Sequence, residues 1–98
     1  MTPQQIIATL RLQDDLMHHY SIKSISLFGS VARNEATDES DVDLLVEFSQ
    51  DAKVSLFQFS RLRRELSKIL QCNVDIVTPD ALHKELKADI LKEAVHAA

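Results

Sequence analysis

The residues of this chain that are best suited to chemistry are a glycine–serine pair and a group of aspartates. Gly29 and Ser30 are followed, after ten residues, by Asp41, and Asp43 comes two positions later. Alternate residues of a strand project from the same face, so Asp41 and Asp43 are expected side by side. Clustered carboxylates raise one another's pKa unless a cation lies between them, and all-oxygen ligands favour Mg²⁺ over zinc or copper. The spacing therefore predicts a magnesium site.

Asp75 is a third acidic residue in a strand-like setting, within the sequence NVDIV. Aspartate is depleted from strands, so its presence there favours a role as a ligand. Three carboxylates are the set needed to hold two magnesium ions about 4 Å apart for phosphoryl transfer. Asp41, Asp43 and Asp75 are therefore predicted to bind metal and to act in catalysis.

The glycine–serine pair is predicted to hold the phosphates of a nucleotide. Gly29 is the only glycine of the chain, and glycine lets the backbone come close to a ligand. Ser30 is expected to open a helix whose free N–H groups and hydroxyl bind phosphate oxygens. Arg33, one turn further on, is suited to clamp a triphosphate. These residues together predict a reaction in which an acceptor hydroxyl attacks the α-phosphorus and pyrophosphate leaves.

These side chains need a fold that brings the end of one strand beside the start of the next. The pattern of apolar and turn-forming residues predicts strands that alternate with helices. The strands are expected at 24–28, 42–48 and 73–77. The helices are expected at 3–19, 30–36, 56–70 and 79–95, and capping boxes begin at Thr2 and Ser55.

Each expected strand has an apolar row and a polar row, so one face of the sheet should be covered. The apolar rows hold Ile25 and Leu27, then Val42, Leu44, Val46 and Phe48, then Val74 and Ile76. An antiparallel pair of the first two strands, joined by residues 29–41, brings the glycine–serine pair to the aspartates. The long helical connection to the third strand indicates a parallel crossover, which places Asp75 level with Asp41 and Asp43. The predicted fold is α/β (α+β), a small mixed sheet of three to four strands with helices on one face.

The composition is that of one folded domain spanning residues 1–98, with 45% hydrophobic and 27% charged residues. No apolar run approaches the roughly 18 residues of a membrane span. The N-terminus is not that of a signal peptide, and the lone Cys72 excludes an internal disulfide, so a cytoplasmic protein is expected. Residues 1–50 carry eight Asp and Glu against three Lys and Arg, and the net charge is −4. Direct binding to nucleic acid is therefore not expected.

The stretch SISLFGSVARNEATDESDVDLLVEF resembles the nucleotidyltransferase superfamily that includes DNA polymerase β. It is most similar to the minimal nucleotidyltransferases of bacteria and archaea, whose core motif is Gly-Ser, ten residues and Asp-x-Asp. Gly29, Ser30, Asp41 and Asp43 match this motif in full. The tail DILKEAVH at 89–96 is also similar, so the resemblance spans nearly the whole chain. It implies one nucleotidyltransferase domain with a polymerase β-type fold.

The resemblance also implies roles for these residues. Asp41 and Asp43 correspond to metal ligands and Gly29 and Ser30 to phosphate-binding residues, while Asp75 matches the third acid by its place on the next strand. Members of the group are commonly antitoxins paired with an all-helical HEPN ribonuclease toxin. The implied activity is Mg²⁺-dependent transfer of AMP from ATP to a tyrosine of the toxin. A nucleoside triphosphate and a helical toxin are thus the expected partners, the latter in a hetero-oligomer.

Other functions and plainer roles stay open. The chain is also suited to neutralise a toxin by complex formation without catalysis. A third hypothesis is transfer to a small molecule such as an aminoglycoside, or to an RNA end. Ser30 is suited to act only as a helix N-cap, and Arg33 to form ion pairs with Glu35, Asp38 or Glu39.

Outside the motif, the sequence predicts ordinary structural roles. The basic cluster on the second long helix is expected to form a solvated face; it consists of Arg61, Arg63, Arg64 and Lys68. Cys72 and the four phenylalanines are core candidates. The tail helix either covers the sheet or presents apolar residues to a partner.

Overall fold

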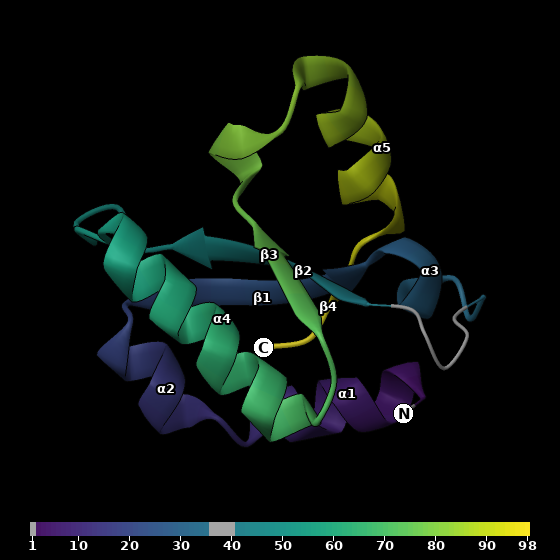
Figure 1. Ribbon diagram of the computed structural model, residues 1–98. Helices are drawn as coiled ribbons and strands as arrows, with labels where there is room; N and C mark the ends of the chain where they lie inside the picture. The colour runs from purple at the N-terminus through teal and green to yellow at the C-terminus, as the bar shows by residue number, and fades with distance from the viewer. Residues whose placement is uncertain (1, 36–40) are drawn as a thin grey trace.

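The computed structural model describes residues 2–35 and 41–98. These form a four-stranded sheet in the order β3-β2-β1-β4, flanked by helices (Figure 1). The strands are β1 (Ile22–Phe28), β2 (Val42–Phe48), β3 (Val74–Val77) and β4 (Val95–His96). The helices are α1 (Pro3–Arg11), α2 (Asp14–His19), α3 (Gly29–Ala32), α4 (Leu56–Leu70) and α5 (Lys84–Glu93), with a short 3₁₀ helix η1 (Pro79–Ala81).

The pairing of the first three strands confirms the predicted mixed α/β sheet. β1 and β2 are antiparallel, and β2 and β3 are parallel and joined by the crossover helix α4. Antiparallel pairing brings the end of β1 to the start of β2, and parallel pairing brings the start of β3 to the same place. The sheet topology therefore gathers the ends that carry the sequence motif.

The two predicted capping boxes are confirmed, and they fix where α1 and α4 begin. The Thr2 side chain accepts the Gln5 N–H, and the Gln5 side chain accepts the Thr2 N–H in return. Ser55 and Gln58 make the same reciprocal pair at the start of α4. Each box satisfies two N–H groups that a helix start would otherwise leave without partners.

The predicted single helix over residues 3–19 is wrong, because the chain breaks into α1 and α2 at Leu12 and Gln13. Neither residue is glycine or proline, so no strong breaker marks the position. The sequence feature that marks the start of the second helix lies just after Gln13. Asp14 and Asp15 occupy the first turn of α2, where negative charge is favoured by the helix dipole.

The hydrophobic core lies between one face of the sheet and the helices α1 and α4, with α2 at its margin. In Figure 1 these three helices lie together below the strands. The predicted apolar rows of the strands are buried, except that Phe48 is partly buried. The fully enclosed side chains are Ile6, Leu10, Ile25, Leu27, Leu44, Val46, Leu62, Leu66 and Leu70. Burial of these aliphatic residues is the main force that holds the sheet against the helices.

The predicted helix over residues 79–95 is wrong at both ends. The chain first forms η1 and only then α5. At Ala94 the backbone becomes extended, and the following residues form β4 against β1. Beyond β4 the Ile25 N–H donates to the Ala98 carbonyl at 2.8 Å. The tail thus supplies partners to an edge of β1 that would otherwise expose unpaired backbone groups.

Helix α5 does not cover the core. It has no buried residue and lies against α3, apart from the other long helices (Figure 1). Leu86 and Leu91 are 54% and 50% exposed. Of the two possibilities for the tail, the structure therefore shows the one in which α5 presents apolar side chains outward.

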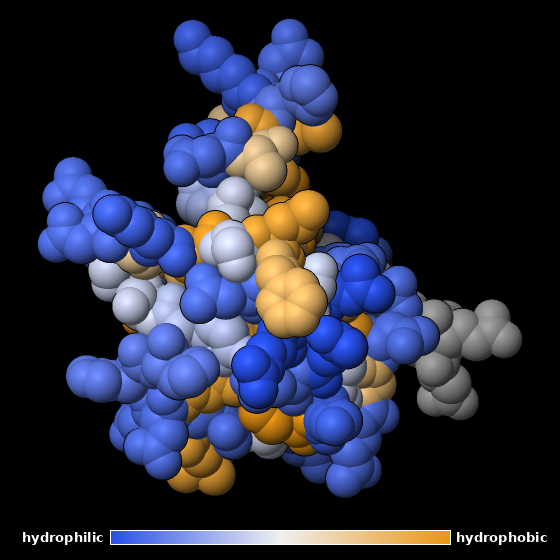
Figure 2. All heavy atoms as spheres, turned by 60° about the vertical axis from the view of Figure 1, so that its left-hand side comes forward, coloured by the Kyte–Doolittle hydropathy of each residue, from blue (hydrophilic) through white to orange (hydrophobic). Residues whose placement is uncertain are grey.

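Hydrophobic side chains also reach the surface at the start of α4. Figure 2 shows hydrophobic atoms in the middle of a largely hydrophilic face. Leu56 is 83% exposed and Phe57 is 74% exposed, so the prediction that every phenylalanine belongs to the core is wrong for Phe57. Phe59 and Cys72 do pack against the core. Of the helices in the described ranges, none is long and apolar enough to cross a membrane.

Candidate active site

Gly29 stands at the junction of β1 and α3 in a backbone conformation that favours glycine. Its φ is +78°, a value that side-chain-bearing residues adopt only at a cost. A Cβ atom at this position would collide with Oδ2 of Asp43 and would lie 3.1 Å from its Cγ. The only glycine of the chain therefore lets the backbone pass directly beside the Asp43 carboxylate. The prediction that the antiparallel strand pair brings the glycine–serine pair to the aspartates is thus confirmed for Gly29 and Asp43.

The strand register brings Asp43 and Asp75 together. Asp43 pairs with Phe28 on β1 and with Asp75 on β3. The predicted alignment of Asp75 with the Asp-x-Asp pair is thus confirmed. Asp41 is exposed immediately before β2, and Asp75 is exposed on β3, whereas Asp43 is partly buried between the flanking strands.

Partial burial and neighbouring negative charge both act on the Asp43 carboxylate. Burial raises its pKa above the ordinary value, and the charges of Asp75 and Asp41 raise the pKa further. A divalent cation relieves such crowding, and Mg²⁺ prefers carboxylate oxygens as ligands. The donor set therefore fits a divalent cation. Within residues 2–35 and 41–98, however, no three His, Cys, Asp or Glu side chains already converge as a metal site.

Helix α3 is shorter than the helix predicted over residues 30–36. It begins one residue earlier, at Gly29, and Asn34 just beyond it has a left-handed φ of +59°. The N-cap position belongs to Phe28, which makes no side-chain cap. The interpretation of Ser30 as an N-cap is therefore wrong. Ser30 is partly buried in the single turn of α3, and residue 36 lies outside the described ranges.

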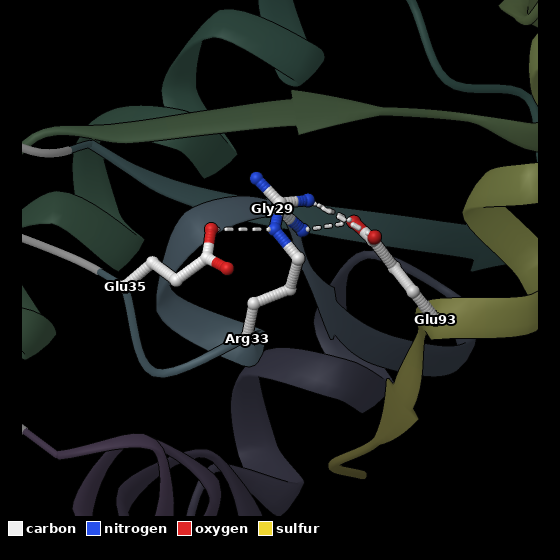
Figure 3. A network of polar contacts seen from close by, with 4 residues as sticks. All are labelled: Gly29, Arg33, Glu35 and Glu93. Atoms are coloured by element: carbon white, nitrogen blue, oxygen red, sulfur yellow. Dashed lines mark hydrogen bonds and ion pairs between the residues drawn. The ribbon is translucent and has the colours of Figure 1, made fainter.

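The Arg33 guanidinium lies between two carboxylates (Figure 3). Its Nε donates to Glu35 Oε2 at 3.1 Å, which confirms one of the predicted ion pairs. Its Nη1 donates to both carboxylate oxygens of Glu93 at 3.0 Å. The other partners predicted for Arg33, at positions 38 and 39, lie outside the described residues. These bonds raise the pKa of Arg33, so its positive charge is secure.

Glu93 is a member of this site that the sequence reasoning missed. Its Oε1 accepts the Gly29 N–H at 2.8 Å as well as the bond from Arg33. The Gly29 N–H and the Arg33 guanidinium together lower the pKa of Glu93, which keeps it ionised. Glu93 lies 64 residues from Gly29 along the chain, and no spacing rule connects positions so far apart. The only hint in the sequence is the similarity of the tail at 89–96, which contains it.

Sequence comparison relates the chain to enzymes. The nucleotidyltransferase domain family matches residues 11–96. A candidate protein adenylyltransferase of Methanocaldococcus jannaschii is 45% identical over 76 residues, which are 78% of this chain and 80% of that protein. The protein adenylyltransferase MntA of Thermococcus cleftensis is 34% identical over 82 residues, which are 84% of this chain and 81% of MntA.

Solved structures agree with the sequence comparison. A candidate minimal nucleotidyltransferase superposes with a TM-score of 0.80 and 34% identity, covering 97% of this chain and 95% of that chain. A toxin–antitoxin complex with AMP-PNP shares the fold, with a TM-score of 0.74 and 18% identity over 94% of this chain and 72% of that chain. The fold and the motif together define a nucleotidyltransferase. Within that class, the chain belongs to the minimal nucleotidyltransferase family, as the resemblance in sequence predicted.

Proposed function

We propose that this protein transfers AMP from ATP to a hydroxyl of a partner protein. The observation that carries the proposal is the register of Phe28, Asp43 and Asp75, which places the Gly29–Ser30 turn beside two carboxylates. Triphosphate-binding groups and metal-binding groups then face one reaction centre. The relatives named as protein adenylyltransferases support AMP as the group transferred.

The acceptor we propose is a tyrosine of a helical HEPN-type toxin, and the protein then acts as the antitoxin. The support is that several structures with this fold are toxin–antitoxin complexes, one of them with an AMPylated HEPN toxin. These structures share only the fold with this chain. The exposed apolar residues of α5 also suit a partner that packs beside the site, since Leu86 and Leu91 are about half exposed.

In this proposal each motif residue has one task in binding. Ser30 and Arg33 hold the phosphates of ATP, and Gly29 lets the chain approach them closely. Asp41 and Asp43 hold Mg²⁺, with Asp75 as the third ligand, and a pair of ions is expected as in other two-metal sites. When bound, Mg²⁺ supplies the positive charge that neutralises the triphosphate and lowers the pKa of the acceptor hydroxyl. The three side chains must turn toward the ion, since they do not yet converge.

The reaction exchanges one phosphorus–oxygen bond for another. The tyrosine oxygen forms a bond to the α-phosphorus of ATP while the bond to the bridging oxygen of the β-phosphate breaks. Pyrophosphate leaves with that electron pair. The tyrosine proton passes to solvent water, which reaches this end of the sheet because Asp41 and Asp75 are exposed. Arg33 and Ser30 hold the departing phosphates in line.

The direct test is purification with the helical partner, followed by incubation with ATP and Mg²⁺ and intact-mass measurement. The expected result is a gain of one or more AMP groups on the partner, and none with the double variant Asp41→Asn, Asp43→Asn. The matched control is Asp51→Asn, which removes an exposed carboxylate in the turn after β2 and should leave labelling unchanged. If the wild type leaves the partner unmodified, the proposed transfer is wrong.

A neutralisation assay separates catalysis from simple complex formation. Antitoxin activity that depends on transfer should disappear in the double aspartate variant. If the variant still neutralises the toxin and the two proteins still co-purify, neutralisation works by occlusion instead. Labelling of an aminoglycoside or an RNA end in place of the partner would redirect the proposal to those acceptors.

A further inference from the structure

The Glu93 carboxylate accepts hydrogen bonds from the groups that are proposed to bind the phosphates of ATP. One of its oxygens accepts the Gly29 N–H at 2.8 Å, and the Arg33 guanidinium holds both oxygens at 3.0 Å. A carboxylate and a phosphate oxygen are both anionic acceptors, and they prefer the same donors. The side chain of Glu93 is only 30% exposed, so it is set into the site rather than extended into solvent.

Glu93 is held there against the preference of its own helix. It is the last residue of α5, where the helix dipole presents its negative end and disfavours a negative charge. Its stabilisation therefore comes from across the fold, from the end of β1 and from α3. Helix α5 has no buried residue and lies against α3, so these hydrogen bonds help to hold its end beside the site.

We propose that Glu93 is an internal occupant of the phosphate-binding groups, a carboxylate that closes the site in the absence of nucleotide and must leave when the triphosphate enters. This inference rests on the proposed function, since it assigns Arg33 and the Gly29 turn to the phosphates. Displacement frees Arg33 for the nucleotide and loosens α5, which also presents the apolar residues suited to a partner. Nucleotide binding and the position of α5 are then coupled.

The test is calorimetric titration of AMP-PNP with Mg²⁺ into the wild type and three variants. Glu93→Gln keeps the shape of the side chain but loses its charge. If Glu93 closes the site in about four-fifths of wild-type molecules, the apparent Kd of the wild type is about fivefold higher than that of an open site. The variant should therefore lower the Kd about fivefold. Glu93→Asp keeps the charge but is one methylene shorter, and should lower the Kd by less. Glu35→Gln removes the other carboxylate on Arg33. It should change the Kd less than about twofold, because the Gly29 N–H donates to Glu93 and not to Glu35.

Two results would overturn the proposal while leaving the proposed function in place. A higher Kd in Glu93→Gln would mean that Glu93 positions Arg33 for the nucleotide instead of competing with it. If Glu93→Gln and Glu35→Gln lower the Kd equally, the change comes from the loss of one negative charge near Arg33 and not from displacement of Glu93. Should Glu93→Gln fail to fold, as judged by circular dichroism, Glu93→Asp alone decides between tighter and weaker binding.

The amide proton of Gly29 gives a second readout. In the wild type, the exchange rate of this proton should change on addition of inorganic tripolyphosphate, because a phosphate oxygen replaces Glu93 as its acceptor. In Glu93→Gln without any ligand, the exchange should be faster than in the wild type. An unchanged Gly29 amide with bound tripolyphosphate contradicts displacement. If the wild type binds neither AMP-PNP nor tripolyphosphate, both the inference and the proposed function are wrong. If binding behaves as expected and the partner stays unlabelled, only the proposed transfer is wrong.

Discussion

At the scale of single residues, the site depends on the close approach of the Gly29 backbone to the Asp43 carboxylate. Gly29 adopts a φ of +78°, and its missing side chain leaves room for the Asp43 carboxylate. Burial raises the pKa of Asp43, and the charges of Asp75 and Asp41 raise it further. A backbone conformation that favours glycine and a carboxylate in an unfavourable electrostatic environment therefore lie side by side.

Gly29→Ala should damage activity far more than stability. The new Cβ meets the Asp43 carboxylate and a strained φ, so we expect a loss of stability of about 1–2 kcal/mol and a loss of AMP transfer of about 100-fold. The matched control is Asn34→Gly, which relieves a left-handed φ of +59° one turn away and should leave transfer unchanged. Thermal melting and the labelling rate measure the two effects. Labelling at the wild-type rate in Gly29→Ala would contradict this account of the site.

Asp43→Asn should stabilise the fold in the absence of divalent cations. Because the folded-state pKa of Asp43 is raised, the folded protein binds this proton more tightly than the unfolded chain, and the ionised carboxylate destabilises the fold above that pKa. We expect the Tm of the variant at pH 7 to be higher by about 2–5 °C. The difference should vanish as the pH falls below the unfolded-state pKa, where the carboxyl group is protonated in both states.

Melting curves between pH 7 and pH 3, recorded with a chelator and then with Mg²⁺, check this prediction. Added Mg²⁺ should raise the Tm of the wild type and leave that of Asp43→Asn nearly unchanged. Asp51→Asn serves as the control for loss of an exposed carboxylate. If Asp43→Asn has a lower Tm than the wild type at pH 7 with chelator present, the ionised carboxylate of Asp43 does not destabilise the fold.

At the scale of elements, α4 positions the third aspartate. It makes the crossover between β2 and β3, and its buried leucines pack that crossover onto the sheet. The capping box of Ser55 and Gln58 fixes where the helix begins. The register of Asp43 and Asp75 therefore depends on a helix that contains neither residue.

Ser55→Ala should lower stability without changing the chemistry. Loss of the cap costs about 1 kcal/mol, which for a domain of this size corresponds to a Tm lower by about 4–8 °C. Ser60→Ala, at an exposed position of the same helix, is the control and should leave the Tm nearly unchanged. Well below the Tm, the transfer rate should equal that of the wild type. Equal melting temperatures of the two variants would show that the cap does not hold α4.

At the scale of the whole molecule, charge is segregated between two regions. Aspartates gather at one end of the sheet, whereas the exposed basic cluster of Arg61, Arg63, Arg64 and Lys68 lies along α4. The net charge is −4. An acidic protein with one short basic stripe suits a protein partner better than the backbone of a nucleic acid.

Binding to single-stranded RNA should accordingly be weak. At about 150 mM salt we expect a Kd of about 10⁻⁴ M or weaker, as for non-specific contacts with few phosphates. Fluorescence anisotropy with a labelled RNA measures it, and the double variant Arg63→Gln, Arg64→Gln tests the basic cluster. Tight binding that falls steeply with salt and is lost in this variant would make α4 an RNA-binding surface.

Local signals in the sequence determined much of the fold and the core of the site. The capping boxes at Thr2 and Ser55 are confirmed, and so is the apolar row of β2, although Leu45 on its opposite row is buried as well. The predicted antiparallel pairing of β1 and β2, which brings Gly29 to Asp43, is also confirmed. The capping boxes and the apolar rows act over a few residues, through one hydrogen-bonded turn or through the period of a strand. That range is short enough to be recognised along the chain.

Only the tertiary structure decided which distant groups meet. The end of the tail became β4 because β1 had a free edge, although the apolar spacing of residues 79–95 suits a helix equally well. Glu93 reached Gly29 because α5 folds back against α3. Such contacts depend on which hydrogen-bonding groups the rest of the fold leaves without partners. A sequence pattern that spans a few residues cannot predict which groups these are.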